Sequence, residues 1–525
     1  MKEPAPPRAI MRAGVSPSWS DEALAAIHAA GLELLARVGV KAPSPAVREL
    51  LLDAGCAAGT GDRVLIAGAV VAEALAACPR EFTEGARNPA NDLSIDPDPG
   101  PVYVHNTGET AIVLDPSTGQ PRPSTFADQV AAARLMHHLQ NQHSLNPLLS
   151  PQDVPGVLAP LYSYLALASE SDKCIGGPGV SLVGQVQYLL EMADAVLGDG
   201  AARGARRLSM YFSPVSPLQL GGEVSEGLML AARAGAVCQI LPAPTAGTTG
   251  PASLAAALAQ QHAEVLAVVV VVQAVNPGTP CFYGPRLQAS DPRTGTATWG
   301  TPVLGLCAAG ATLLARRCGL PCDCYGLATD AKVVDAQNGY ERAINGLLGA
   351  LARPRYLSGV GGLHSVVAAG LEQIEVDDEI LGYLLYALEE RPWDAEALDV
   401  EALVEGVLAG GFLGVRQTRT SLRREACPTT ISYHGGLQEW LSRGRTNVLE
   451  AARERMWAHL ADEPVGLPAD IEARLCGLID GAGRELGLSE WPDPRRLLDE
   501  ARVAIAGRAV PGGAQATDGS RPCQT

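Results

Sequence analysis

The chain has 525 residues, of which 47% are hydrophobic and 18% charged, so it can bury a sizeable core. Its 40 basic and 57 acidic residues leave a formal charge of −17, which disfavours nucleic acid as a partner because an acidic surface repels phosphate. No apolar run reaches the roughly 20 residues of a membrane span and the N-terminus lacks the hydrophobic region of a signal peptide, so we expect no membrane contact and a cytoplasmic protein with free thiols.

Residues 1–123 are predicted to form an N-terminal elaboration of helices and β-hairpins. After an irregular arm, Ser20 can cap an amphipathic helix whose first turn holds Asp21 and Glu22. A second helix is expected over residues 45–54. Clusters of Asn, Asp, Pro and Gly then separate short β-prone runs up to residue 123, which is typical of hairpins.

From residue 124 to residue 400, short β-prone runs alternate with helical stretches. The runs cover 173–177, 208–212, 237–241, 281–283, 322–325 and 356–360, and the helices 181–197, 221–234, 254–273, 301–317, 335–352 and 377–390. Repeated βα units indicate a parallel sheet, and their number favours an α/β fold of the closed (β/α)8 TIM-barrel type over an open doubly wound sheet. We expect residues 401–506 to add C-terminal helices that complete the barrel, and residues 507–525 to be a disordered tail.

Two local patterns in this region could mislead. The valine run 268–272 resembles a strand, but no helix breaker separates it from Leu254, so we predict one long buried helix. The segment Gly-Gly-Pro-Gly at 176–179 has the wrong spacing for a dinucleotide-binding fingerprint.

Aromatic residues gather where the predicted strands end, which is where a TIM barrel carries its functional groups. The candidate substrate-binding rings are Tyr211, Phe282, Tyr283, Trp299 and Tyr325. Around one cavity, each ring could attract an alkylated ammonium ion by ~0.5–2 kcal/mol. Composition alone favours the alternative that these rings only fill the rim of the barrel.

A polar cluster interrupts the long apolar helix at Gln261 and Glu264. A carboxylate among Ala, Leu and Val needs a partner, so Glu264 is a candidate catalytic residue that could neutralise a bound ammonium ion, with Gln261 as a candidate substrate contact. Alternatively, Glu264 could pair with Arg286 or Arg293 and hold the barrel together.

Charged groups also lie on two loops after strands. Asp330 and His364 are candidate catalytic residues there, and Lys332 is a candidate substrate contact. Helix capping and surface ion pairing account for many such charges and remain the alternative.

Three cysteines, Cys318, Cys322 and Cys324, form a Cys-x3-Cys-x-Cys pattern. No second cysteine pair or histidine accompanies them at ligand spacing, so buried thiols are favoured over a metal site and no metal is predicted.

Several segments in order resemble the trimethylamine methyltransferase superfamily. The specific ones are Ala257–Glu264, with its Ala-Gln-Gln-x-Ala-Glu pattern, and Asp335–Glu341, which reads Asp-Ala-Gln-Asn-Gly-Tyr-Glu. Weaker matches are Leu34–Val40, Asn88–Leu93, Pro151–Pro155, Gly300–Pro302 and Asp378–Gly382.

The resemblance implies a TIM barrel that passes a methyl group from an amine to the Co(I) corrinoid of a separate carrier protein, with no tightly bound cofactor of its own. Archaeal trimethylamine enzymes of this family carry pyrrolysine on the loop that here reads Leu327–Lys332, which has only ordinary residues. Members without pyrrolysine are similar to betaine and carnitine demethylases. We therefore expect a homo-oligomer that demethylates a small quaternary amine, or less favourably a tertiary one.

Some segments depart from the family pattern. His364 stands where an acidic residue is expected, Gly411–Gly414 lacks an opening histidine, and Ala426–Pro428 lacks an aromatic residue. These changes leave two alternatives open: an inert betaine-binding homologue, or a TIM-barrel methyltransferase that uses another methyl donor.

Overall fold

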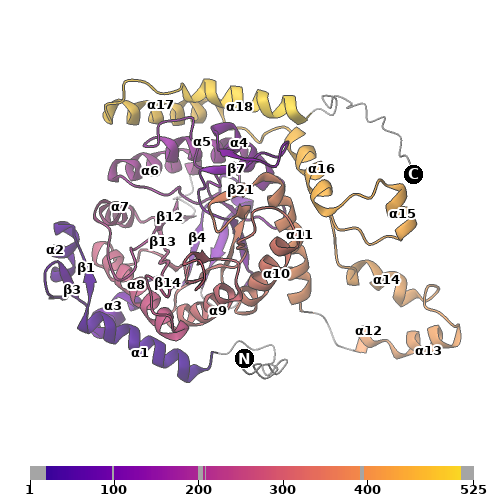
Figure 1. Cartoon of the computed structure of the whole chain (residues 1–525), viewed down its shortest axis with the longest axis horizontal. Helices are drawn as coiled ribbons and strands as arrows, with labels where there is room; N and C mark the ends of the chain where they lie inside the picture. Colours follow the sequence, from indigo (N-terminus) through magenta and orange to yellow (C-terminus); the bar gives the residue numbers. More distant parts are fainter. Residues whose placement is uncertain (1–18, 97–99, 199–204, 207, 391–394, 510–525) are drawn as a thin grey trace, which may run out of the picture.

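The computed structural model describes residues 19–96, 100–198, 205–206, 208–390 and 395–509. The expected N-terminal arm and most of the expected disordered tail lie outside these residues. Helix α18 (Pro494–Ala509) continues past residue 507, where the tail was expected to begin. The chain has a mixed α/β fold in which helices surround a set of short parallel strands (Figure 1).

The central strands are parallel and fall into two sheets. One sheet has the order β10-β9-β6-β19-β18 and the other β12-β13-β15. Isolated parallel bridges, Gly176 to Ser209 and Tyr283 to Cys322, lie between the edges of the two sheets. The strands are β6 (Tyr103–Asn106), β9 (Ser144–Leu145), β10 (Cys174–Ile175), β12 (Ser209–Phe212), β13 (Val237–Ile240), β15 (Cys281–Tyr283), β18 (Asp323–Tyr325) and β19 (Tyr356–Val360). The continuous pairing therefore forms two sheets and not one closed barrel.

A helix follows each central strand and packs outside it, so that the helices encircle the strands in chain order (Figure 1). They are α4 (Phe126–His138), α5 (Ala159–Glu170), α6 (Val183–Leu197), α7 (Gly222–Arg233), α8 (Leu254–Val275), α9 (Pro302–Arg317), α10 (Ala336–Leu351) and α11 (Leu371–Leu388). The predicted helices and strands of residues 173–390 are confirmed, with α11 beginning six residues earlier than expected.

Helix α8 contains the valine run, as predicted. It is long and apolar enough to cross a membrane, but most of it is buried inside the fold. Helices α1 (Asp21–Arg37), α2 (Pro45–Asp53) and α3 (Gly68–Ala77) pack against it from outside. An N-cap bond from the Ala23 N–H to Ser20 Oγ begins α1, as the sequence predicts.

Short strands outside the two central sheets form small sheets of their own. At the start of the strands, the hairpin of β4 (Phe82–Glu84) and β5 (Leu93–Ile95) packs Phe82 edge-on against Phe282, with ring centroids 5.7 Å apart. The remaining strands are β1 (Val40–Lys41), β2 (Ala57–Ala58), β3 (Arg63–Leu65), β7 (Ile112–Leu114), β8 (Pro121–Pro123), β11 (Ala205–Arg206), β14 (Thr245–Ala246), β16 (Gln288–Ser290), β17 (Ala297–Thr298), β20 (Gly362–Leu363) and β21 (Ala368–Gly370), and Pro89–Asn91 forms a 3-10 turn.

The C-terminal part is helical. Helices α16 (Val448–Ala461), α17 (Ala469–Glu485) and α18 pack on α4, α5, α6 and α11. Helices α12 (Ala395–Leu398), α13 (Val400–Leu408), α14 (Arg416–Glu425) and α15 (Leu437–Ser442) form an arm that extends away from the rest of the molecule (Figure 1).

Strand β6 corrects the expected position of the first boundary. It lies within residues 1–123, which were expected to form only an elaboration, yet it pairs with β9 on one side and β19 on the other. Its short Tyr-Val-His-Asn sequence lies among turn clusters that resemble hairpin connections, and parallel pairing with distant strands leaves no local signal.

Candidate active site at the strand ends

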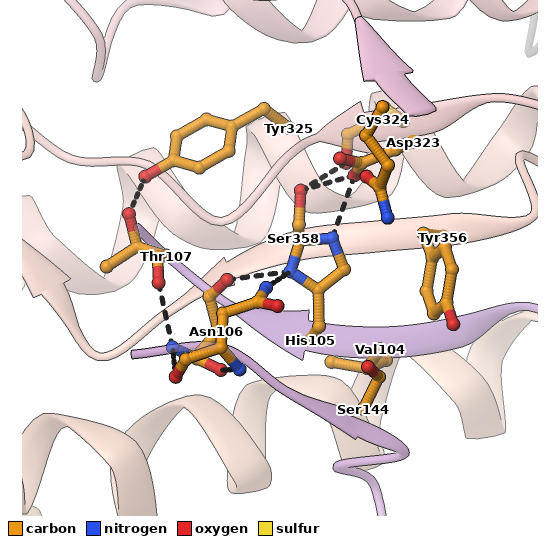
Figure 2. A network of polar contacts seen from close by, with 12 residues as sticks. Val104, His105, Asn106, Thr107, Ser144, Asp323, Cys324, Tyr325, Tyr356 and Ser358 are labelled. Atoms are coloured by element: carbon orange, nitrogen blue, oxygen red, sulfur yellow. Dashed lines mark hydrogen bonds and ion pairs between the residues drawn. The ribbon is translucent and has the colours of Figure 1, made fainter. Parts of the chain in front are cut away.

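A buried polar network crosses the central strands, and Asp323 of β18 is its centre (Figure 2). His105 Nε2 of β6 lies 3.1 Å from Asp323 Oδ1, and Ser358 Oγ of β19 donates to the same oxygen at 2.7 Å. Arg286 Nη2, from the loop after β15, lies 2.6 Å from Asp323 Oδ2. Burial alone would raise the pKa of Asp323, but Arg286 and His105 hold it well below its usual range. The carboxylate is therefore ionised and fully paired.

The network continues to Asn146 and Tyr211 at the neighbouring strand ends. Tyr211 donates its hydroxyl proton to Asn146 Oδ1 at 2.7 Å, and Asn146 Nδ2 lies 2.7 Å from His105 Nδ1. A Cβ at Gly176 would lie 1.8 Å from Asn146 Oδ1, so only glycine fits there. Burial raises the pKa of Tyr211, which keeps this phenol protonated.

Tyr325 connects this network to an aromatic corner at the carboxyl end of β18. Its hydroxyl lies 2.6 Å from Thr107 Oγ1, and the Arg286 guanidinium lies 4.8 Å from its ring centroid. Trp299 meets the ring edge-on, with centroids 5.5 Å apart. Two electron-rich rings at right angles form a surface that can attract an alkylated ammonium ion.

Asp330 holds the loops beside this corner. Its Oδ1 accepts hydrogen bonds from the Trp299 N–H at 2.8 Å and from Ser365 Oγ at 2.7 Å. Lys332 Nζ donates to the Asp330 carbonyl at 2.6 Å, and the His364 N–H donates to the Ala331 carbonyl. The structure thus brings together Trp299, Tyr325, Asp330, Lys332 and the backbone of His364, all of which the sequence analysis singled out.

The turn after β20 is strained. His364, Ser365 and Val366 have φ angles of 49°, 56° and 66°, which L-residues adopt rarely and β-branched residues almost never. Val366 nevertheless packs against the cluster that contains Tyr325 and Trp299. Strain of this kind concentrates at functional sites, where the surrounding contacts maintain it.

Glu109, on the loop after β6, is a carboxyl group that the sequence analysis did not identify. Its side chain is partly exposed but densely surrounded, and burial raises its pKa to about 8 despite a hydrogen bond from the Gly179 N–H. At neutral pH Glu109 is therefore mostly protonated, and a bound cation would favour loss of its proton.

Glu264 and Gln261 lie on α8 and accept hydrogen bonds from loop residues rather than contacting the aromatic corner. Glu264 accepts hydrogen bonds from Ser216 Oγ at 2.8 Å and from the Leu218 N–H at 2.9 Å. Gln261 Oε1 accepts from the Arg286 N–H at 3.1 Å. The alternative pairing of Glu264 with Arg286 or Arg293 is wrong, since Arg286 pairs with Asp323 and Arg293 with Asp291.

Phe282 and Tyr283 do not join the aromatic corner. Phe282 lies in the cluster at the start of the strands, next to Phe82. Tyr283 points outward to α8, where its hydroxyl lies 3.1 Å from His262 Nδ1. Neighbouring residues of a strand face opposite sides, so two consecutive aromatics cannot share one surface.

The residues missed by the sequence analysis share one signal. His105, Asn146, Asp323 and Ser358 are buried polar groups within or directly after β-prone runs. Asp323 is the clearest, because an acidic residue between Cys322 and Cys324 in a buried strand requires a charged partner.

Cys322 and Cys324 are buried free thiols, as the sequence analysis favoured. Cys318 is half-buried and directly follows α9.

The chain matches known proteins over most of its length. The family model for trimethylamine methyltransferase (MTTB) matches residues 7–487. A glycine betaine methyltransferase of Desulfitobacterium hafniense is 30% identical over 88% of this chain and 96% of its own length. The trimethylamine methyltransferase MttB of the same species is 27% identical over 92% and 98% of the two chains. The solved monomethylamine methyltransferase (MtmB) of Methanosarcina barkeri is 12% identical and matches 89% of this chain and 93% of its own, with a TM-score of 0.44.

Proposed function

The chain belongs to the trimethylamine methyltransferase (MTTB) family, and on this premise we propose that it demethylates a small quaternary methylamine such as a betaine, or a tertiary one. The methyl group passes to the Co(I) corrinoid of a partner protein. The observation that carries this proposal is the family match over residues 7–487, which includes every loop of the candidate site. It is a methyltransferase.

Trp299 and Tyr325 are proposed to bind the ammonium group. Their rings meet at 76°, and Asp330 holds the Trp299 backbone in place. Tyr211 and Lys332 are proposed as further substrate contacts. His364, predicted as a catalytic residue, is exposed on the strained turn beside them. Asp330 and Glu264 act as positioning residues in this proposal, because both accept hydrogen bonds from loop groups at the strand ends.

A quaternary nitrogen simplifies the chemistry. The nucleophile forms a bond to the methyl carbon, the carbon–nitrogen bond breaks, and its electron pair leaves with a neutral tertiary amine. No proton has to be supplied to the leaving group, so the protein needs mainly to orient the methyl group and exclude water. The ordinary residues at Leu327–Lys332 agree with such a substrate.

The carrier's corrinoid supplies the nucleophile when the two proteins meet. The loops that hold Asp330 and Ser365 also expose apolar side chains, with Val333 51% and Val367 48% exposed. An apolar rim beside the site suits contact with a second protein. We propose that this rim receives the carrier.

We further propose that the two parallel sheets close into a (β/α)8 barrel. Each central strand is followed by one helix, and the bridges Gly176–Ser209 and Tyr283–Cys322 lie at the two gaps between the sheets. An experimental structure with hydrogen-bonded strands across both gaps would support closure, and open gaps filled by side chains would contradict it.

Homo-oligomerisation, a cytoplasmic location and the absence of nucleic acid or membrane partners remain proposals. The exposed apolar side chains of the arm support self-association, with Leu408 84% and Leu413 88% exposed. The burial of α8 supports the absence of a membrane partner, and the net charge of −17 supports the absence of a nucleic-acid partner.

The test of function uses the full chain, a reduced corrinoid carrier and a panel of betaines, trimethylamine and methoxylated aromatics. Consumption of Co(I), followed by its absorbance, together with release of the demethylated amine from a betaine supports the proposal. Betaine binding by calorimetry without any Co(I) consumption would instead favour an inert binding homologue. Turnover of only a methoxylated donor would overturn the substrate class.

A further inference from the structure

Three potential metal ligands meet outside the ring of strands, at the junction of α1, α8 and α9. His28 belongs to α1, His262 to α8, and Cys318 directly follows α9. One nitrogen from each imidazole and the Cys318 sulfur all lie within 4.8 Å of one another. None of the three takes part in the candidate active site.

The two imidazoles already face each other. His28 Nδ1 lies 2.8 Å from His262 Nε2, so one proton is shared across this contact. A tetrahedral Zn2+ with bonds of about 2.0–2.1 Å needs these nitrogens about 3.3 Å apart. Metal binding would therefore require a small rotation of the His28 ring, which is half-buried.

The surroundings of His262 match those of a metal-binding histidine. Its second ring nitrogen, Nδ1, lies 3.1 Å from the Tyr283 hydroxyl, and the two rings stack with centroids 5.8 Å apart. Ligating histidines usually bind an outer partner in this way, which fixes the ring orientation. A Cβ at Gly31 would lie 3.1 Å from His262 Cδ2, so this glycine lets α1 approach α8 closely.

We propose that His28, His262 and Cys318 bind a divalent zinc-class cation, with solvent water as the fourth ligand. Two imidazoles and one thiolate are donors that Zn2+ accepts readily. On binding, the Cys318 thiol releases its proton to solvent as the sulfur–metal bond forms, and the proton between the imidazoles passes through solvent to a ring nitrogen that faces away from the metal, so that both ligating imidazoles stay neutral. Arg317 is the neighbouring cation, and it is exposed, so solvent screens its charge.

The cation would cross-link the N-terminal helix to two helices of the outer layer. Its role would therefore be structural and independent of methyl transfer. This separates the proposal from the proposed function, because neither depends on the other.

The experiment measures metal binding by the full chain. Purified protein, freed of metal with a chelator, is titrated with Zn2+ or Co2+ alone. We expect one equivalent to bind, a thiolate-to-cobalt charge-transfer band in the near ultraviolet, and an increase in Tm of about 2–5 °C with Zn2+.

Two variants and a matched control decide the ligands. Cys318→Ser should abolish the charge-transfer band and the Tm increase, and His28→Gln should weaken both. Cys427→Ser, which removes another half-buried thiol far along the chain, should keep both. Circular dichroism checks that each variant folds, and His28→Gln serves if Cys318→Ser does not.

Absence of bound metal in the wild-type chain would overturn the proposal. An unchanged band in Cys318→Ser, or an equal Tm increase in all variants, would show adventitious binding elsewhere and overturn it as well.

Discussion

Single residues at the strand ends combine several roles. Tyr325 contacts Thr107 with its hydroxyl, Arg286 with its face and Trp299 in a T-shaped ring contact. Burial raises its pKa, so it stays a neutral phenol. The Tyr325 and Trp299 rings are the ones proposed to attract the ammonium group, and replacing one ring at a time tests this proposal.

Replacing the indole should weaken substrate use. We expect Trp299→Ala to lower kcat/KM for a quaternary amine by about 2- to 30-fold, because one cation–π contact of ~0.5–2 kcal/mol is lost. Steady-state kinetics with the carrier measures the change. Trp440→Ala, in the arm, is the matched control. Equal kcat/KM values for Trp299→Ala and the wild type would place the substrate elsewhere.

Glu109 should make stability depend on pH. Its folded pKa of about 8 lies above its ordinary value of 4.5. The stability that comes from its protonated form is therefore fully present below about pH 4.5 and is lost as the pH rises through about 8. Glu109→Gln should match the wild type in Tm near pH 5 and exceed it near pH 9. A constant difference between the two melting curves at both pH values would contradict the raised pKa.

Whole elements depend on contacts that their own sequences do not reveal. The sequence of helix α8 predicts an apolar core helix. Its Glu264 nevertheless accepts hydrogen bonds from the Leu218 N–H and the Ser216 hydroxyl, both of which belong to the loop between β12 and α7. Burial raises the pKa of Glu264, and these hydrogen bonds oppose that effect. From helix α8, the Glu264 carboxyl group therefore holds this loop in place at the strand ends.

Removing the Glu264 carboxyl group should lower the free energy of unfolding more than it lowers turnover. Glu264→Ala leaves the buried Leu218 N–H without its partner, and we expect a loss of about 1–3 kcal/mol in the free energy of unfolding. Denaturant unfolding measures it. Glu264→Gln, which keeps an acceptor, should lose less stability and retain turnover. A folded Glu264→Gln without activity would instead support the direct catalytic role predicted from the sequence.

At the scale of the whole molecule, the Asp323 network joins β6, β18, β19 and the loop after β15. Asp323→Asn leaves Arg286 buried without its counter-ion, so we expect a loss of about 3–5 kcal/mol in the free energy of unfolding. Because the pKa of Asp323 is lowered in the folded chain, this stabilisation is fully present above the ordinary carboxyl pKa and is lost progressively as the pH falls from that value toward the lower folded pKa. Unfolding at pH 7 and pH 2.5 should show a smaller difference between variant and wild type at the lower pH. An equal difference between variant and wild type at both pH values would contradict the ion pair between Asp323 and Arg286.

The arm should control assembly. Leu408 and Leu413 are among its most exposed apolar side chains, and we expect Leu408→Glu to lower the molar mass measured by light scattering toward that of one chain. Val503→Glu, on α18, is a matched exposed control that should leave the mass unchanged. A wild-type chain that is monomeric would contradict self-association.

The alternation of strands and helices over residues 173–390 was predictable because each element carries its own local pattern, such as β-branched runs and apolar periodicity. The Asp330–Lys332 loop and its neighbour Trp299 were also predictable, since loops after parallel strands meet at one end. The place of strand β6 in the central sheet was not, because only its distant partners β9 and β19 define it.

The sequence by itself determined the family and the order of βα units, since both depend on residues close together along the chain. Only the tertiary structure decided the direction in which each side chain points. Phe282 points inward at the start of the strands, and Tyr283 points outward to His262. Asp323 points to His105 and Arg286. These contacts join segments up to 218 residues apart, as Thr107 and Tyr325 do. Packing of distant segments leaves no periodic signal in the chain, and so it has to be seen in the folded molecule.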